Sequence, residues 1–583
     1  MSSDLESFKR LIDIGIALSA EKDTNTLMET ILLEAKEFGN ADGGTLYRRN
    51  KHDQLTFEIL RNDSLGIAQG GTTGEDIPIP PQEMYIDGVP NNQQIVSNAA
   101  LSGQTLNIRD AYDSTEFDFS GTKKFDEGTG YRTKSVLTVP LKNSQDDVIG
   151  VLQLLNAQDT DGTVIEFSEE IQPLIEALAS QAAVALDNAI LIEAQENLLD
   201  SFITLMARAV DAKSPYTGGH CERVPELTEM LTNAACDTKE GPFAWFDLTE
   251  EEWYELHIGA WLHDCGKVTT PEYVVDKATK LETITDRIHE VRMRFEVLKC
   301  EKIIECQEKI IAGGDAERLR KELDATLCQI DDDFEFIAEC NLGGEFMADE
   351  LVDRVKQIAT QTWTRTLDDR KGIAFEELKR KEREEPKALP CEEPLLADRQ
   401  DHIIEHDDVV HSADPNNPYG FKIEVPEHKY NLGEIYNLCI GRGTLTEEER
   451  FKINDHIVQT IVMLDSLPFP KHLERVPEIA GGHHEKMDGT GYPKRLKGEE
   501  MSIPAKVMAI ADVFEALTAA DRPYKAPKKL SDSIKIMSFM VKDQHLDPDL
   551  FKLFLESGVY QDYADKYLLP SQVDEVDIGA YLS

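Results

Sequence analysis

The chain has 583 residues, which is too long for one hydrophobic core, so we expect two or three domains. Its apolar fraction of 41% suits globular domains, and no apolar run approaches the roughly 20 residues that a membrane-spanning helix needs. The formal net charge of −49 argues against binding to a nucleic-acid polymer, because the phosphates would be repelled.

The cysteines and the N-terminus predict a cytoplasmic protein without membrane insertion. The nine cysteines form no CxxC pair, which is typical of reduced thiols rather than of disulfides or a zinc site. The first residues, MSSDLESFKRLIDIG, include acids, unlike a secretory signal. In so acidic a chain, an anionic substrate would need local positive charge, for which bound metal cations are the obvious candidate.

Residues 1–165 predict a mixed α/β domain. Amphipathic patterns predict helices over residues 8–20 and 25–38, and the segments TLYRRN, LTFEIL, SVLTVPLK and VIGVLQLLN predict strands. This layout resembles a GAF domain, which implies an antiparallel sheet with helices and a sensor role. The resemblance is sharpest over residues 117–156, which are similar to GAF domains that bind cyclic nucleotides. Ala157 stands where those domains usually carry lysine, so a cyclic nucleotide, another small ligand and a purely dimerising role all stay open.

Residues 166–202 predict a linker helix. No proline or glycine interrupts the chain from Leu174 to Ala212, which indicates one long helix. Alternating spacings of three and four residues give a heptad seam with polar residues in its middle, which predicts a parallel coiled coil and a homodimer. The alternative is an ordinary helix that packs on its own domains. The seam consists of Leu174, Leu178, Gln181, Ala185, Asn188, Ile192, Gln195, Leu199, Phe202, Met206 and Ala209.

Residues 203–583 predict an all-α domain that an insertion interrupts at 283–436. Charged helical patterns cover residues 285–310 and 316–330, with a break at Gly313 and Gly314. A proline-rich, acidic stretch follows. We interpret the insertion as a helical hairpin plus irregular loops, and its role stays open between a docking surface, a lid and a spacer.

Histidines and aspartates gather in five short motifs of this second domain. A lone histidine is usually a surface or core residue, but five of the 14 histidines lie in motifs with acidic neighbours. Imidazole and carboxylate together suit iron, manganese or zinc, and adjacent His and Asp can serve two neighbouring cations because a carboxylate has two oxygens. The motifs are SPYTGGHCERV with His220, WLHDCGK with His263, Asp264 and Lys267, TLTEEERFKINDHIVQT with His456, GGHHEKMDGTGYP with His483 and His484, and AIADVFEALTAADRPYK with Asp512, Arg522 and Lys525.

HDCGK and HHEKMDGTGYP resemble the HD-GYP phosphodiesterases, a branch of the HD superfamily of metal-dependent phosphohydrolases. The resemblance covers residues 201–281 and 443–555. It implies two divalent metal ions, iron or manganese, with Asp264 as the bridging ligand and Lys267 near the scissile phosphate. Arg522 and Lys525 match basic residues that contact substrate phosphates. The implied metal ligands are His220, His263, Asp264, His456, His483, His484 and Asp512.

Two departures from that family bear on the metal site. The insertion separates the HDCGK motif from the next histidine ligand, so His289 rivals His456 for that role. Counting from Lys280 and Leu281, which match the family's KL pair, places Arg292 at the ligand offset, whereas the same offset from Leu445 reaches His456; we therefore favour His456. Tyr216 stands where members with three metals carry glutamate, which predicts a binuclear site.

The function that this resemblance implies is hydrolysis of cyclic di-GMP to pGpG and/or GMP, regulated by the GAF domain. Lys267 would stabilise developing negative charge or protonate the leaving oxygen. The GYP turn at residues 491–493 either frames the substrate or serves only as scaffold, and Asp488 is a candidate to orient a histidine ligand. The alternatives are a catalytically silent receptor or scaffold for cyclic dinucleotides, and a phosphodiesterase for a mixed cyclic GMP–AMP dinucleotide.

Overall fold

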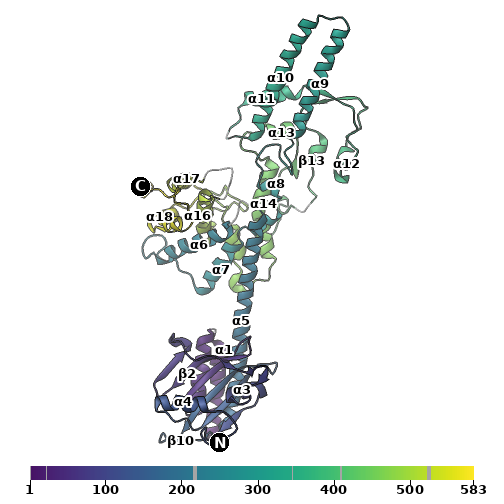
Figure 1. The fold of residues 1–583 in the computed structure, drawn as a ribbon. Helices are drawn as coiled ribbons and strands as arrows, with labels where there is room; N and C mark the ends of the chain where they lie inside the picture. The colour runs from purple at the N-terminus through teal and green to yellow at the C-terminus, as the bar shows by residue number, and fades with distance from the viewer. Residues whose placement is uncertain are drawn as a thin grey trace. The chain divides into compact units, whose positions relative to one another are not determined.

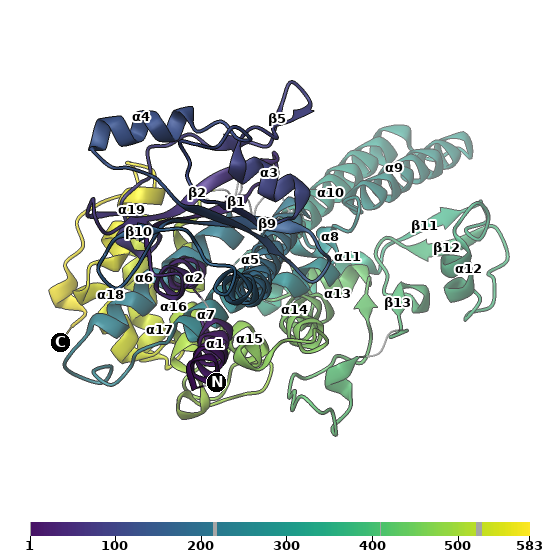
Figure 2. The same cartoon turned by 90° about the horizontal axis from the view of Figure 1, so that it is seen from below.

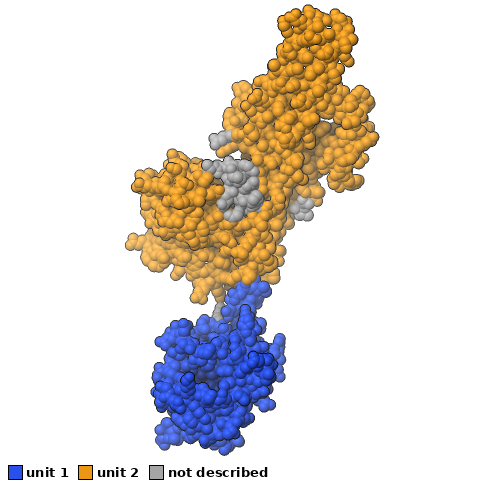
Figure 3. All heavy atoms as spheres, in the orientation of Figure 1, with its two compact units in different colours: residues 1–199 blue, residues 200–583 orange. Residues whose placement is uncertain are grey.

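The computed structural model describes residues 2–21, 23–213, 219–344, 346–407, 410–520 and 527–582. The chain divides into two compact units, residues 1–199 and 200–583, which Figure 3 shows in different colours. The division falls inside one long helix, α5 (Gln172–Lys213).

The first unit is built around an antiparallel sheet with the strand order β3-β2-β1-β9-β8-β7. All four predicted strands lie in the central part of this sheet, three of them as β2, β8 and β9 and the fourth as the second half of β1. The strands are β1 (Ala41–Arg49), β2 (Gln54–Asn62), β3 (Ile67–Gly70), β7 (Leu106–Ile108), β8 (Val136–Lys142) and β9 (Val148–Gln158). Short strands β4 (Gln82–Glu83) and β10 (Val164–Ile165) pair with β2 and β9, and β5 (Tyr85–Ile86) pairs with β6 (Val89–Pro90).

Helices cover both faces of this sheet, which explains why its central strands are buried along most of their length. Figure 2 shows α2 and α5 on one side and α3 and α4 on the other. On the first side α1 and α2 pack with the start of α5, and on the second α3 packs with Phe117 and Phe119. Asp23 caps α2 by accepting a hydrogen bond from the Thr26 backbone N–H (2.7 Å). The helices are α1 (Ser2–Ala20), α2 (Thr24–Phe38), α3 (Ile95–Ser102) and α4 (Ser120–Thr129).

The long helix α5 has two different environments along its length. Near its start, Ile175, Leu178 and Leu186 are buried in the core of the first unit, whereas Ile192 and Phe202 are more than half exposed. The predicted heptad seam is therefore divided, because Leu178 already packs inside its own unit. Among the described helices, α5 alone is long and apolar enough to cross a membrane, and 39% of its most apolar window is buried inside the protein.

The second unit is helical around a core shared by α6, α7 and α16–α19. Capping boxes start two of its helices, from Thr249 and Glu252 at α7 and from Thr446 and Glu449 at α14. The helices are α6 (His220–Asp237), α7 (Glu250–Leu262), α8 (Glu272–Val275), α14 (Glu447–Asp465), α15 (Val476–Gly481), α16 (Ile503–Thr518), α17 (Leu530–Lys542), α18 (Pro548–Glu556) and α19 (Val559–Tyr567).

The insertion has a hydrophobic core made by Phe295, Ile337, Val355 and Leu396 among others, to which the flanking Leu281 and Leu438 also contribute. Figure 1 shows α9 (Ile288–Ile311) and α10 (Ala316–Leu342) side by side as the hairpin that the charge pattern predicts. The stretch predicted as irregular loops also holds helices α11 (Asp349–Ala359), α12 (Phe375–Lys381) and α13 (Glu434–Leu438). It further holds two short strand pairs, β11 (Thr362–Arg365) with β12 (Cys391–Pro394), and β13 (Ile403–Ile404) with β14 (Tyr430–Asn431).

A buried lysine brings the two ends of the insertion together. The Lys280 ammonium donates hydrogen bonds to the backbone carbonyls of Leu438 (2.8 Å) and Ile440 (2.9 Å). Close by, the buried Lys277 forms an ion pair with Glu449 at 2.8 Å. We call this contact of Lys280 with Leu438 and Ile440 the neck. Because the two ends of the insertion meet there, its roughly 150 residues do not separate the segments on either side.

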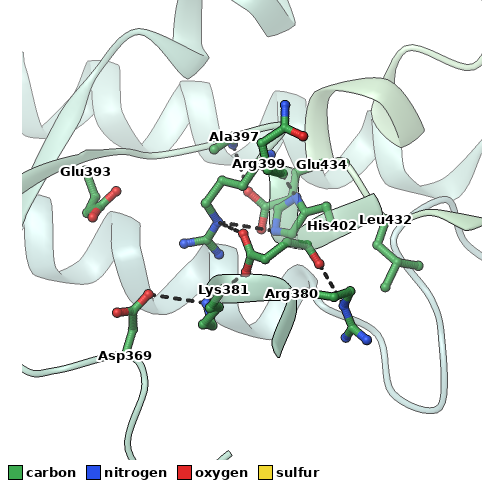
Figure 4. A network of polar contacts seen from close by, with 12 residues as sticks. Asp369, Arg380, Lys381, Glu393, Ala397, Arg399, His402, Leu432 and Glu434 are labelled. Atoms are coloured by element: carbon green, nitrogen blue, oxygen red, sulfur yellow. Dashed lines mark hydrogen bonds and ion pairs between the residues drawn. The ribbon is translucent and has the colours of Figure 1, made fainter. Parts of the chain in front are cut away.

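A polar network joins the later segments of the insertion (Figure 4). Lys381 bridges Asp369 (3.2 Å) and Asp401 (2.8 Å), and the Ala397 N–H donates to Glu434 (2.9 Å). His402 lies buried in this network, where burial and the positive charge of Arg399 lower its pKa to about 4.

This lowered pKa predicts that acid destabilises the insertion. Between about pH 6.5 and 4 the unfolded chain protonates His402 and the folded chain does not, so stability falls as pH falls through this window. We expect His402→Gln to reduce the dependence of unfolding free energy on pH by up to about 1.4 kcal/mol per pH unit. Urea unfolding of the full chain at pH 7, 6 and 5 measures it. The exposed His289→Gln is the control, and an unchanged pH slope in His402→Gln would contradict the prediction.

Candidate metal centre

Five separate parts of the second unit carry the predicted ligand residues. His220 opens α6, and His263 ends α7 with Asp264 directly after it. His456 lies on α14, His483 and His484 follow the end of α15, and Asp512 lies on α16. These positions span nearly three hundred residues of sequence, so only the tertiary fold can bring them together.

The structure places all seven side chains in three overlapping groups. Within each group the potential ligand atoms lie within 4.8 Å of one another, and His263 and His483 each belong to two groups. The shared histidines make the three groups one continuous cluster of nitrogen and oxygen donors. The groups are His456 with His483 and His484, His220 with His263 and Asp512, and His263 with Asp264 and His483.

A glycine allows two of these parts to approach. An ideal Cβ on Gly266 would lie 1.9 Å from the His456 carbonyl oxygen, so no side chain fits there. The Gly266 N–H also donates to the Thr460 hydroxyl (2.9 Å) on α14. This contact between the HDCGK loop and α14 brings His456 Nε2 to 3.3 Å from Asp264 Oδ1.

Backbone carbonyls orient three of the histidines in the same way. The Nδ1 atoms of His263, His456 and His483 each face the backbone carbonyl three residues earlier, at Ala260 (2.7 Å), Ile453 and Ala480 (2.8 Å). If Nδ1 carries the proton, Nε2 presents its lone pair to the cluster. Within the described residues, the buried Nε2 atoms of His263 and His483 have no hydrogen-bond partner. Buried polar atoms without partners are uncommon in proteins, and a metal ion would satisfy both.

The fourth imidazole, His220, is oriented by a carboxylate instead. Its Nδ1 contacts Glu515 (2.6 Å), and its Nε2 lies 3.2 Å from Asp264 and 3.4 Å from Asp512. Arg223 pairs with the same Glu515 at 2.6 Å. Burial opposes the charge on Glu515, but the contacts with His220 and Arg223 outweigh it and lower its pKa to about 2. This carboxylate–histidine arrangement is common behind metal-binding imidazoles.

Asp264 occupies the centre of the cluster. The residue is 2% exposed, its Oδ2 contacts His220, His263 and the Lys267 ammonium, and its Oδ1 faces His456. Burial alone would raise the pKa of this carboxyl, but Lys267 and His263 hold it well below its usual range. The carboxylate is therefore charged and has one oxygen toward each side of the cluster, which suits a bridging ligand.

Two residues at the end of α5 reach the same region, and sequence reasoning missed them. The Lys213 ammonium donates to the backbone carbonyls of Lys267 (3.2 Å) and Val268, which fixes the HDCGK loop. The Asp211 carboxylate accepts from the Gly219 N–H (3.2 Å), directly before His220. A small cavity opens onto the cluster, lined by Val210, Asp211, Lys213, His220, Cys221, Asp264, Lys267, Glu272 and Val275.

The remaining residues singled out in the sequence are not found in the cluster of the described residues. Arg522, Lys525 and Tyr216 lie outside the described residues. His289 is exposed on α9, where Arg292 contacts its Nδ1 (2.6 Å), and it belongs to none of the three groups. Asp488 was expected to orient a histidine. Instead it is a turn residue whose carboxylate accepts from the Thr490 N–H (2.8 Å) and hydroxyl (2.7 Å), so that expectation receives no support.

Glu515 was also missed, although the spacing Asp512–x–x–Glu515 places both carboxylates on one face of α16. The GYP turn likewise has a contact that sequence alone does not show. The Tyr492 ring stacks on His484 with centroids 4.9 Å apart and an interplanar angle of 22°.

Comparison with known proteins identifies both domain types. Residues 23–186 match the family described as GAF domain, and residues 390–550 match the family described as HD domain, a range that contains His456, His483, His484 and Asp512. The chain therefore combines a GAF domain with an HD domain.

Three curated relatives illustrate the similarity. A 3′3′-cGAMP-specific phosphodiesterase 1 of Vibrio cholerae is 37% identical over 150 residues, which are 24% of this chain and 33% of the relative. A cyclic di-GMP phosphodiesterase of the same species is 38% identical over 123 residues, 20% of this chain and 25% of the relative. A cyclic di-GMP phosphodiesterase of Thermotoga maritima is 34% identical over 130 residues, which are 22% of this chain and 34% of the relative. The chain thus spans between a quarter and about a third of these relatives' lengths.

The contact between His220 and Glu515 predicts that Glu515 supports metal binding. We expect Glu515→Gln to weaken metal affinity roughly 10- to 100-fold, because the amide orients the imidazole less well and removes a negative charge. Competition with a chromophoric chelator for Mn(II) measures this effect. The control is Glu556→Gln, an exposed glutamate on α18, and equal affinity in the two variants would contradict the prediction.

Proposed function

We propose that this chain is a metal-dependent phosphodiesterase of the HD-GYP type that hydrolyses cyclic di-GMP to pGpG and/or GMP under control of its GAF domain. One observation carries the proposal most. Seven histidine and aspartate side chains converge, and among the described residues the buried Nε2 atoms of His263 and His483 have no hydrogen-bond partner.

The donor set fits two divalent cations, iron or manganese. It consists of imidazole nitrogens and carboxylate oxygens, and this combination suits both metals. We assign His220, His263, Asp264, His456, His483, His484 and Asp512 as the ligands, with Asp264 between the two ions. Bound there, the ions would neutralise phosphate charge and make an attacking water more acidic.

The chain's own residues would bind and orient the phosphodiester beside this centre. Lys267 is about one-third exposed, and Asp264 and Asp512 outweigh burial and raise the pKa of its ammonium. It therefore stays charged near neutral pH, where it can stabilise negative charge on the phosphate or donate a proton to the leaving oxygen. Lys213 holds the backbone of this loop in place. Arg522 and Lys525 are proposed to contact the substrate phosphates.

The substrate class rests on the relatives' names. Those names include both cyclic di-GMP and 3′3′-cGAMP phosphodiesterases, so the mixed cyclic GMP–AMP dinucleotide is the second candidate substrate. A catalytically silent receptor is a weaker alternative, because the chain has a residue of the required type at all seven ligand positions.

The first unit and α5 would provide regulation and dimerisation. A cyclic nucleotide or another small ligand would bind the GAF domain, and a homodimer would form through the linker helix of a cytoplasmic protein. The exposed Ile192 and Phe202 lie on the predicted seam beyond the part of α5 that its own core buries. Apolar side chains at seam spacing favour a second copy as their partner.

The metal centre predicts the outcome of a direct assay. Full-length protein loaded anaerobically with Fe(II) or Mn(II) is expected to linearise cyclic di-GMP, with turnover of cyclic GMP–AMP measured beside it. Both His263→Ala and Asp264→Ala should reduce turnover to background and lower bound metal below two ions per chain. His472→Ala, an exposed histidine of the same unit, is the matched control. Turnover that survives in both site variants would refute the assigned site, and metal binding without turnover in the parent protein would favour the silent receptor.

The seam predicts the oligomeric state. We expect Ile192→Glu combined with Phe202→Glu to convert a dimer into a monomer in light scattering coupled to size exclusion, because charges in an apolar seam are poorly solvated. Leu191→Glu is the control, since Leu191 is equally exposed but lies off the seam. A parent protein that is already monomeric, or a double variant that remains dimeric, would contradict the dimer interface.

A further inference from the structure

A segment of the insertion packs directly against the helix that carries His456. Residues 419–424, here called the strap, alternate between inward and outward side chains. Phe421 is 5% exposed and packs with Val458 and Ile461 of α14, and Tyr419 and Ile423 cover the edges of this cluster. Upstream, Asn417 accepts from the Phe421 N–H (2.8 Å), which fixes the entry of the strap.

The same face of α14 contacts the segment that carries the paired histidines. An ideal Cβ on Gly481 would lie 2.4 Å from Ile461 Cγ1, so Ile461 packs against bare backbone two residues before His483. Packing is therefore continuous from Phe421 through Ile461 to the end of α15. A displacement of the strap would reach both α14 and α15 through these contacts.

The outward side of the strap also contacts residues 489–496, here called the GYP loop, which contain the GYP turn. The Lys422 N–H donates to the Pro493 carbonyl oxygen (2.7 Å), and Glu424 pairs with Arg495 at 3.0 Å. Pro493 directly follows Tyr492, whose ring stacks on His484. On its other side the loop is held by Glu485, which accepts from the Lys494 N–H (2.6 Å) and the Leu496 N–H (2.9 Å).

Arg495 adopts a backbone conformation that favours glycine. Its φ is 57°, in the left-handed region that residues with a Cβ rarely occupy. Glycine would fit this backbone more easily but could not reach Glu424. Strained positions of this kind concentrate at functional loops, and here the strained residue is the one that contacts the insertion.

We propose that the strap is a positioning element of the active site, and that the insertion thereby sets the place of the GYP loop against the bound substrate. This inference rests on the proposed phosphodiesterase function. It assigns the insertion a role that a passive spacer would lack. The Lys422 and Glu424 contacts end on Pro493 and Arg495 rather than on a proposed metal ligand, so their loss affects substrate affinity more than metal retention.

Two variants at one position isolate the backbone contact. Lys422→Pro removes the N–H that binds Pro493, whereas Lys422→Ala keeps it, and the Lys422 side chain is exposed. Loss of one hydrogen bond of typical strength corresponds to about a fivefold change. We expect Lys422→Pro to raise KM for cyclic di-GMP by about that factor with kcat and metal content nearly unchanged, while Lys422→Ala matches the parent.

Hydrogen exchange measured by mass spectrometry provides a readout that does not depend on turnover. Peptides covering residues 489–496 should exchange faster in Lys422→Pro than in Lys422→Ala. Arg495→Gly gives a second test if proline disturbs folding, because glycine relieves the left-handed φ and removes the ion pair. We expect it to loosen the same peptides and raise KM without lowering the melting temperature, and Glu424→Gln should give a smaller change in the same direction.

The outcomes separate this inference from the proposed function. If Lys422→Pro and Arg495→Gly exchange and turn over like Lys422→Ala, the strap does not position the loop, although the phosphodiesterase assignment stands. If the parent protein shows no turnover but residues 489–496 still exchange faster in Lys422→Pro than in Lys422→Ala, the positioning role is supported and the proposed function is refuted.

Discussion

The arrangement of the second unit depends on stabilising the buried carboxylate of Asp264. Asp264 is almost fully enclosed, in a chain with 49 more acidic than basic residues, and an isolated charge at that position would be strongly unfavourable. His220, His263 and Lys267 surround it, so the negative charge is neutralised locally. Without those partners the buried carboxylate would be unfavourable. The helices that carry them therefore have to meet at Asp264. Metal ions bound there, as proposed, would supply the local positive charge that an anionic substrate needs in so acidic a protein.

Geometry around this carboxylate is set by backbone more than by side chains. Three histidines each face the backbone carbonyl three residues before them, and Gly266 brings the loop against α14 without an intervening side chain. The insertion follows the same logic at a larger scale. Lys280 joins its two ends through backbone carbonyls, and the strap reaches the GYP loop through a backbone N–H. Such contacts constrain the path of the chain while leaving most side chains of the insertion free to vary.

Much of the fold follows from local patterns, because strand alternation and helical periodicity are local properties. The predicted strands of the GAF domain and the hairpin of α9 and α10 are examples. The choice of His456 over His289 also came from counting residues, and the structure puts His456 in the cluster and His289 on the insertion surface. Contacts between residues far apart in the sequence could not be predicted in this way. Glu515, Lys213 and the strap matter through contacts across 54 to 295 positions, and no local pattern encodes these. The heptad seam was ambiguous for a physical reason, since Leu178 satisfies its apolar surface inside its own unit.

The neck formed by Lys280 has a consequence for how such a protein can change. Because both ends of the insertion meet there, the hairpin beyond it ends in a solvent-facing turn, with Gly313 and Gly314 next to the exposed Ile311. Lengthening or shortening that hairpin leaves the joined ends where they are. The tip is therefore a natural place for evolution to add material, or for an experimenter to graft a reporter, whereas a deletion that removes the strap would disturb the centre of the domain.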